Sequence, residues 1–252
     1  MAWTESTSAS FACRHSSERA ADAARVLRLL ERTRERLLEQ FPNLDAEELT
    51  VVLHDSRHAL LLSNPLLPAI YGLTSKPARR YVSGWVGRHE LHVLSPRALR
   101  ERASNVSGSF EMLALAPASL YAKRVIVGSN RELQSARLPA RSWAELRWAW
   151  LVEGASRWLS GESGHARSVV GLYMRSGRRP HFPPGPRDAP LLAPSLIDLL
   201  AERDGPAGVA RLAGRLHTGG SQAALLHAFP GDGLAAIENE WRSRLRRLGE
   251  GG

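Results

Sequence analysis

The chain has 252 residues, of which 43% are hydrophobic and 23% charged, values typical of a folded globular protein and not of a disordered or collagen-like one. A chain of this length buries roughly 70% of the surface that it exposes when unfolded, so it can form a core without disulfides. The single cysteine, Cys13, excludes intrachain disulfides and excludes thiolate zinc or iron–sulfur centres built by this chain alone.

Basic residues outnumber acidic residues by 34 to 25, which gives a formal net charge of +9. Such a charge suits a partner that is a polyanion, for example nucleic acid. However, Lys76 and Lys123 are the only lysines, and so strong a preference for arginine is also typical of a GC-rich genome. We therefore keep nonspecific polyanion binding as an alternative and do not take it as the leading hypothesis.

The N-terminal sequence MAWTESTSASFACRH lacks the basic start and apolar run of a secretory signal. The longest mainly apolar stretch, 59–71, is interrupted by polar residues and two prolines, so it does not resemble a membrane-spanning helix. These features predict a cytoplasmic protein with no membrane span.

The beginning of the chain alternates strand and helix patterns. A strand is predicted over Ser10–His15 and a long amphipathic helix over Ser17–Phe41, where apolar residues recur every three or four positions. The apolar run Leu49–His54 predicts a short buried strand, and the polar residues Asp55 and Ser56 predict the start of a short helix after it.

An antiparallel hairpin is predicted next, from Tyr81–Val86 and Glu90–Leu94 joined by Gly87-Arg88, and we expect it to close one edge of a small mixed sheet. After Pro96 the periodicity is helical, with loops expected at 104–109, 128–141 and 176–190. The last C-terminal helices are expected over 195–204, 207–217, 221–229 and 234–248. The whole pattern predicts the α+β class, with a sheet followed by a mainly helical C-terminal half.

Two pairs of histidines have spacings close to those of metal ligands. His89 and His92 are one residue too close for the helical HExxH motif, and strand alternation would send them to opposite faces, so we expect them at the surface or a sheet edge. His54 and His58 are separated by the predicted boundary between strand and helix. We expect them to be structural.

The segment 142–161, SWAELRWAWLVEGASRWLSG, is a predicted helix with apolar residues on several sides. A carboxylate at Glu153 therefore needs an explanation. Glu153 could face a cleft as a component of a site, or it could pair with Arg157 one turn later in the favourable order of charges. The spacing leaves both interpretations open.

The run Trp150–Ala155, WLVEGA, followed by Trp158 and Gly161, resembles the WLxEGxA segment of peptidase MA-like gluzincins, the thermolysin-type zinc metallopeptidases. The resemblance implies a gluzincin-like fold and a single peptidase MA-like domain over residues 1–252, in which residues 1–95 contain the sheet and residues 96–252 are helical. It also implies that Glu153 stands at the position of the third zinc ligand.

In that family an upstream helix carries HExxH, and the helix beginning near Phe110 is where the motif should occur. Leu115, Ala116 and Ser119 stand in the register of the His, Glu and His residues, and the sequence has no histidine between positions 92 and 165. Catalytic zinc needs three protein ligands, so we expect no cofactor and, in particular, no bound zinc.

The same resemblance predicts an arrangement of helices. The helix over 110–126 should pack beside the helix over 143–159, with the hairpin at the nearest sheet edge. Pro117 should open the first helix unless it lies within the first turn. Glu153 and Tyr121 are the candidate cleft residues, with Tyr121 as a hydrogen-bonding partner of the carboxylate.

A separate candidate site for anions lies in and beside the proline-rich segment 176–190, SGRRPHFPPGPRDAP. Its basic residues have no acidic neighbour before Asp188, and they are Arg175, Arg178, Arg179 and Arg187.

Three functions follow from these patterns. The leading hypothesis is a catalytically degenerate metallopeptidase-like protein that uses the former active-site cleft to bind a peptide or protein partner. The first alternative is a hydrolase with an unorthodox site around Glu153, including Tyr121 and a histidine brought in by folding. The second is the nonspecific basic polyanion binder.

Overall fold

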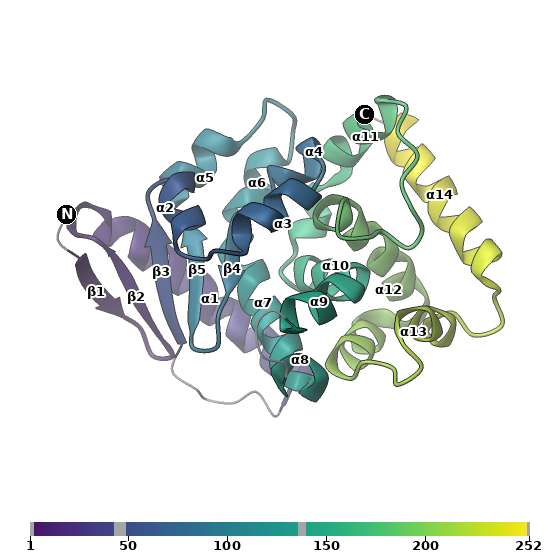
Figure 1. Cartoon of the computed structure of the whole chain (residues 1–252), viewed down its shortest axis with the longest axis horizontal. Helices are drawn as coiled ribbons and strands as arrows, with labels where there is room; N and C mark the ends of the chain where they lie inside the picture. Colours follow the sequence, from purple (N-terminus) through teal and green to yellow (C-terminus); the bar gives the residue numbers. More distant parts are fainter. Residues whose placement is uncertain (1–2, 43–48, 136–139, 251–252) are drawn as a thin grey trace.

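The computed structural model describes residues 3–42, 49–135 and 140–250. Within these ranges, five strands form one mixed sheet in the order β1-β2-β3-β5-β4 (Figure 1). The strands are β1 (Trp3–Thr7), β2 (Phe11–Ser16), β3 (Leu49–His54), β4 (Gly84–Val86) and β5 (Glu90–Leu94). The two central pairings, β2 with β3 and β3 with β5, are parallel, and the two outer pairings are antiparallel. The α+β class and the antiparallel hairpin at one sheet edge are confirmed.

The strand β1 was not predicted from the sequence. Its residues WTEST are mostly exposed, because β1 lies at the outer edge of the sheet beside β2. Alternation of apolar and polar residues identifies a strand that buries one face. A strand with water on both faces lacks this alternation.

One face of the sheet packs against α1 (Ala20–Gln40) and α7 (Ala116–Ser129). The strand residues of this face are apolar and nearly inaccessible, among them Phe11, Cys13, Val51, Leu91 and Val93. The short helix α2 (Arg57–Leu62) packs on the opposite face against β3 and β5. Ser56 caps α2 as the sequence predicted, since its hydroxyl accepts a hydrogen bond from the Ala59 N–H at 3.2 Å.

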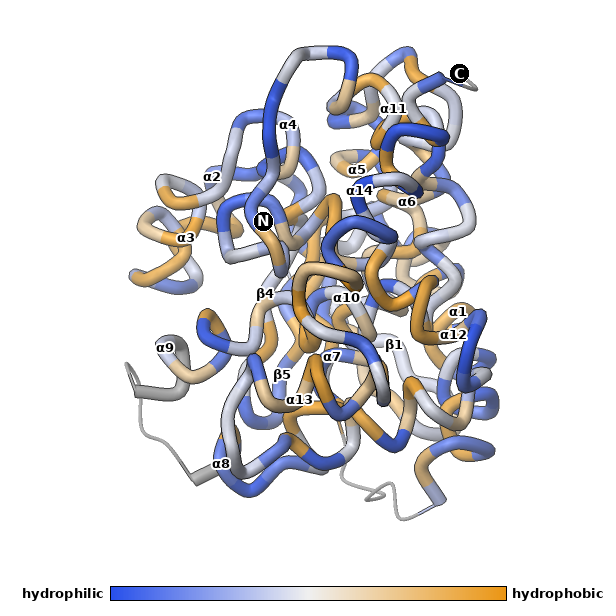
Figure 2. The backbone as a smooth tube through the Cα atoms, turned by 90° about the vertical axis from the view of Figure 1, so that its right-hand side faces the viewer, coloured by the Kyte–Doolittle hydropathy of each residue, from blue (hydrophilic) through white to orange (hydrophobic). Residues whose placement is uncertain are grey.

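The chain after the hairpin is mainly helical, as expected (Figure 1). In Figure 2 the hydrophobic stretches gather in the interior and the hydrophilic stretches lie toward the outside. The remaining helices are α3 (Leu67–Leu73), α4 (Lys76–Arg79), α5 (Pro96–Arg102), α6 (Ser109–Ala114), α8 (Arg131–Ser135), α9 (Ala140–Arg147), α10 (Ala149–Leu159), α11 (Arg167–Arg175), α12 (Ala189–Gly214), α13 (Ser221–Ala228) and α14 (Leu234–Glu250).

Two predicted loops need correction. Most of the described portion of the expected loop 128–141 is helical, in α8 and the start of α9, while its residues 136–139 lie outside the described ranges. The helix α12 begins at Ala189 and not at 195. Pro190 is tolerated there because it lies in the first turn, where a backbone N–H has no acceptor within the helix. Its two halves meet at Gly205, whose φ of 67° interrupts the helix where the sequence predicted a break.

The two predicted site helices are each divided. The first becomes α6 and α7, which meet at Leu115, so Pro117 falls in the first turn of α7 and breaks no helical bond. The second becomes α9 and α10, which meet at Trp148. The expected packing is confirmed, since α7 contacts both α10 and the hairpin strand β4.

Gly154 explains how closely α10 approaches the rest of the helical half. A Cβ atom at this position would come within 2.9 Å of the Ala193 carbonyl oxygen and 2.8 Å of the Ile197 side chain, both on α12. Only glycine permits this approach. As a result, α10 packs closely between α7 and α12.

No helix within the described ranges combines the length and hydrophobicity needed to cross a bilayer.

Candidate functional site

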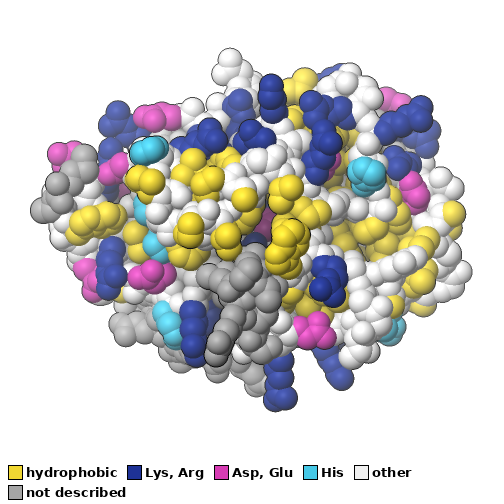
Figure 3. Space-filling view, viewed as in Figure 1, with side chains coloured by type: hydrophobic (Ala, Val, Ile, Leu, Met, Phe, Trp, Pro, Cys, Tyr) yellow, Lys and Arg dark blue, Asp and Glu magenta, His cyan; other side chains and the backbone are white. Residues whose placement is uncertain are grey.

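A cavity of about 600 Å³, here called the Glu153 cleft, lies along the edge strand β4. Its opposite wall comes from α7 and α10, and Pro186 and Pro190 of the proline-rich segment also border it. In the space-filling view, a hollow near the centre of the face is walled by hydrophobic side chains and has charged atoms at its base (Figure 3). The cleft is thus apolar at its sides and charged within.

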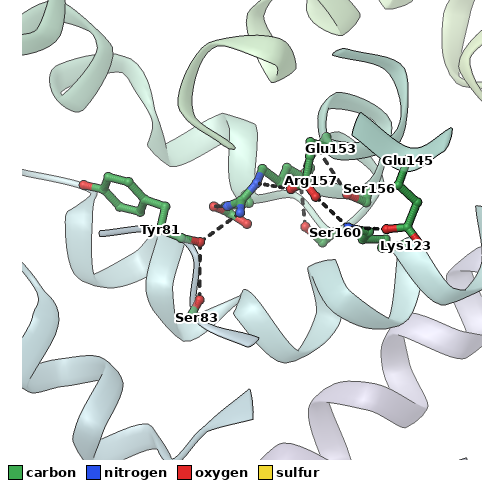
Figure 4. A network of polar contacts seen from close by, with 9 residues as sticks. Tyr81, Ser83, Lys123, Glu145, Glu153, Ser156, Arg157 and Ser160 are labelled. Atoms are coloured by element: carbon green, nitrogen blue, oxygen red, sulfur yellow. Dashed lines mark hydrogen bonds and ion pairs between the residues drawn. The ribbon is translucent and has the colours of Figure 1, made fainter. Parts of the chain in front are cut away.

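Lys123 lies at the centre of this charge. Its ammonium group is 2.8 Å from Glu153 Oε1 and 3.0 Å from Glu145 Oε2 (Figure 4). The three side chains are 19–22% exposed, so water screens their interaction only to a limited extent. Lys123 on α7 therefore links the end of α9 to the middle of α10.

Arg157 continues the network deeper into the protein. Its Nε lies 3.5 Å from Glu153, Nη1 forms an ion pair with Glu162, and Nη2 donates to the Tyr81 carbonyl at 2.9 Å. The Glu162 side chain is only 1% exposed. Glu153 thus faces the cleft and also pairs with Arg157, so the two interpretations of the sequence are compatible.

These contacts fix the protonation of Glu153. Burial alone would raise its pKa, but Lys123 and Arg157 outweigh burial and lower the pKa of the Glu153 carboxyl below its usual range. Burial likewise disfavours the charge on Lys123, yet Glu145 and Glu153 raise its pKa. A carboxylate whose negative charge is stabilised by two cations is a weak base. Glu153 is therefore poorly suited to general acid–base catalysis near pH 7.

Glu162 behaves in the opposite way. Burial raises its pKa to about 7 although Arg157 lies beside it, and one of its carboxylate oxygens has no hydrogen-bond partner among the described residues. The deep end of the network therefore changes its charge near neutral pH.

The residues of the cleft do not fit the zinc site that the resemblance implies. Ala116 and Ser119, at two positions of the missing HExxH motif, line the cleft, but neither side chain offers a nitrogen ligand. Across the described ranges there is no group of three or more His, Cys, Asp or Glu side chains that could hold a metal ion. Between Glu145 and Glu153, where a cation is needed, the chain supplies the ammonium group of Lys123.

Tyr121 does not take the role expected for it. Its ring packs edge-on against Phe11 with 5.1 Å between ring centroids, and it lines a different cavity on another side of α7. Tyr121 and Lys123 are two positions apart on α7, which turns their side chains about 200° apart around the helix axis. Only one of them can therefore point into the cleft. Lys123, which the sequence analysis left aside, is the partner of Glu153.

The four candidate anion-binding arginines are all exposed, but two of them have contacts with protein groups. Arg175 donates to the Gly249 carbonyl at 2.9 Å, and the Arg178 guanidinium lies over the Tyr173 ring. Arg179 and Arg187 lie on the proline-rich segment, which is tied down where the Arg187 carbonyl accepts from the Ser75 N–H at 2.9 Å.

The structure also forms a histidine pair that the sequence did not predict. His54 Nε2 and His92 Nδ1 are 2.9 Å apart on the neighbouring strands β3 and β5, and His92 Nε2 lies 3.0 Å from Glu90. Trp85 stacks on the His92 ring at 4.1 Å. His92 is buried, so the expectation of a surface or edge position was wrong for it. His89 and His58 are exposed.

Burial and the nearby His92 lower the pKa of His54 to about 4, so the folded protein holds His54 neutral. The unfolded chain, with a pKa near 6.5, takes up the proton first, and stability is lost as the pH falls from 6.5 toward 4. In His54→Gln, this loss should be smaller by about 2–3 kcal/mol over that range, as measured by urea unfolding. His58→Gln, at an exposed position, should keep the wild-type dependence of stability on pH. If His58→Gln reduces that dependence as much as His54→Gln does, His54 is not the responsible group.

Comparisons with protein-family models, with curated proteins and with solved structures found no match to this chain. The resemblance around Glu153 therefore rests on the sequence motif alone and stays a hypothesis.

Proposed function

We propose that this chain is a catalytically degenerate metallopeptidase-like protein whose Glu153 cleft binds an extended peptide segment alongside β4. The supporting observation is a free strand edge that opens into a cleft large enough for a few side chains. The arrangement of hairpin, α7 and α10 around that cleft agrees with a peptidase-like layout.

The edge of β4 offers backbone hydrogen bonds to a peptide. Gly87 N–H donates to the Glu90 carbonyl, and Leu94 N–H donates to the Ser83 carbonyl. In an antiparallel pair the bonded residues alternate, so the backbone groups of Gly84 and Val86 point away from β5, toward the cleft. A bound segment could add one more strand there.

The cleft also offers apolar surface for the side chains of such a segment. Leu67, Ile70, Trp85 and Leu120 line it, and they surround the charged base formed by Lys123 and its carboxylates. Because Lys123 and Arg157 together offset the charges of Glu145 and Glu153, the base does not demand a strongly charged ligand. We expect segments with apolar side chains at alternate positions.

Catalysis is the less supported alternative. A hydrolase would need a base in the cleft with a pKa near 7, whereas Lys123 and Arg157 lower the pKa of Glu153. Glu162 has a pKa of about 7, but it is buried and is not among the residues that line the cleft. A binding role uses the same residues without that requirement.

Selection of linear peptides from a displayed random library against the full chain tests the proposal. Val86→Pro removes an N–H that faces the cleft and leaves the hydrogen bonds to β5 intact. Selected peptides should therefore bind this variant at least about tenfold more weakly than wild type, a loss that corresponds to the free energy of one well-made hydrogen bond or slightly more. Binding is measured by fluorescence anisotropy.

Thr7→Pro is the matched control. The Ser8 N–H bonds to the Phe11 carbonyl, so by the same alternation the Thr7 N–H faces away from β2, at the opposite edge of the sheet. Thr7→Pro should bind like wild type. The proposal fails if no peptide is selected, or if Val86→Pro binds the selected peptides as tightly as Thr7→Pro.

A further inference from the structure

A second cavity, of about 720 Å³, lies on another side of α7 and is here called the arginine cavity. Its walls come from the C-terminal end of α1, the turn of the β4–β5 hairpin, α7 and the second half of α12. The volume is in the range of sites that hold a small organic ligand.

The charged residues of this cavity are mostly positive. Arg34, Arg88, Arg124 and Arg211 line it, and Glu39 is the one carboxylate among the described lining residues. Asp204 compensates some of the charge of Arg211. These residues come from separate elements of the chain, so the excess arises from folding and not from one basic run of sequence.

Two of the arginines are placed by specific contacts. Arg124 Nε donates to the Arg88 carbonyl at 3.1 Å, which fixes its side chain against the hairpin turn. Gly128, one turn later on α7, makes room for the same guanidinium, since a Cβ atom there would lie 2.8 Å from Arg124 Nη1. Arg124 is therefore held at the wall of the cavity by the fold.

Tyr121 shows that Arg34 reaches the same region. Burial raises the pKa of the Tyr121 hydroxyl and Glu31 adds to the rise, while Arg34 and Arg124 act to lower it. Arg34 from α1 and Arg124 from α7 thus line the same cavity as Tyr121, and both act on its phenol.

The cavity also has an apolar side. Phe11, Phe41, Tyr121 and Val125 line it, and the first three provide aromatic surface. A site with arginines at one side and aromatic surface at another suits a ligand that is itself divided in this way.

We propose that the arginine cavity binds a small organic phosphate, in which a phosphate group is joined to a flat apolar or aromatic body of nucleotide size. Arg34 and Arg124 hold the phosphate through their paired N–H donors, and the body lies against the aromatic wall. This site is separate from the proline-rich segment, and it shares Arg88 and Arg124 with the border of the Glu153 cleft.

Isothermal titration calorimetry on the full chain tests this inference, with AMP, 1-naphthyl phosphate, adenosine and inorganic phosphate as probes. At least one of the two organic phosphates should bind about tenfold or more tightly than inorganic phosphate and than adenosine, because both halves of the ligand contribute. Arg34→Gln and Arg124→Gln should each weaken that binding at least about fivefold, the loss expected for one charged hydrogen bond.

The double variant Arg246→Gln/Arg247→Gln is the matched control, since it removes two exposed arginines of α14 that lie outside the cavity. It should bind within about twofold of wild type, and thermal melting confirms that every variant is folded. The inference is overturned if neither organic phosphate binds more tightly than inorganic phosphate, or if the control weakens binding as much as Arg34→Gln. It is also overturned if only single-stranded oligonucleotides bind, because a polyanion groove would then explain the charge.

Discussion

Replacing Arg157 with Met should lower the free energy of unfolding by about 3–5 kcal/mol at pH 8.5. The substitution leaves Glu162, 1% exposed, as a buried carboxylate without its cation, and removes the hydrogen bond to the Tyr81 carbonyl. Breaking one side of a buried ion pair costs more than the pair contributes, because the remaining charge stays out of water. Urea unfolding followed by circular dichroism measures the loss.

The loss should depend on pH in a defined direction. Glu162 has a raised pKa in the folded protein, about 7 even beside Arg157, so the folded state takes up its proton more readily than the unfolded state. The stability of Arg157→Met should therefore recover as the pH falls from 8.5 toward 5.5. The double variant Arg157→Met/Glu162→Met should recover most of the loss at pH 8.5, and Arg147→Met, exposed on α9, should lose less than about 0.5 kcal/mol. An equal loss at both pH values would contradict the assignment of the defect to the Glu162 charge.

The second large effect concerns the cation of the cleft. Lys123→Met should destabilise the protein by about 2–3 kcal/mol, less than Arg157→Met because its partners Glu145 and Glu153 are still about one fifth exposed. Two neighbouring carboxylates would then repel each other across the space that the ammonium group fills. Urea unfolding at pH 7.5 and in 0.1 M and 1 M salt measures the change.

The chain contains its own control for this experiment. Lys76 is the other lysine and is exposed, so Lys76→Met should change the free energy of unfolding by less than about 0.5 kcal/mol. Adding Glu145→Gln and Glu153→Gln to Lys123→Met should restore stability, because no uncompensated charge then remains. If the triple variant is no more stable than Lys123→Met, the methylene chain of Lys123, and not its charge, supports the cleft.

The sequence predicted the elements whose burial leaves a recognisable pattern of apolar residues, on one face in α1 and along nearly the whole strand in β3. The Ser17–Phe41 pattern corresponds to a short 3₁₀ turn and α1, and the run Leu49–His54 corresponds to β3 with the same limits. Periodicity identifies such elements because burial itself selects the pattern. It misses β1, where water reaches both faces, and it does not locate the short break between α9 and α10.

The candidate site was only partly predictable, for a different reason. The pair of Glu153 and Arg157 follows from helical spacing, but Lys123 lies 30 positions before Glu153 and meets it only when α7 packs on α10. His54 and His92 are likewise 38 positions apart and meet through a parallel strand pairing. Spacing rules describe neighbours within one element, whereas these contacts depend on how two elements pair.

The two ends of the sheet differ in what can approach them. Beside β1 lies a more open hollow of about 450 Å³ between the end of β1 and α1, and the charged side chains of Glu5 and Arg14 pair on the surface there. At the other end, β4 has only three residues and lies inside a cleft whose far wall is α7 and α10. Another folded sheet cannot bring its own edge into that space, because its neighbouring strands would collide with the helices. If the cleft binds peptides as we propose, we expect it to admit one isolated strand at a time, such as a loop or an unfolded tail, and to exclude segments already paired in a sheet.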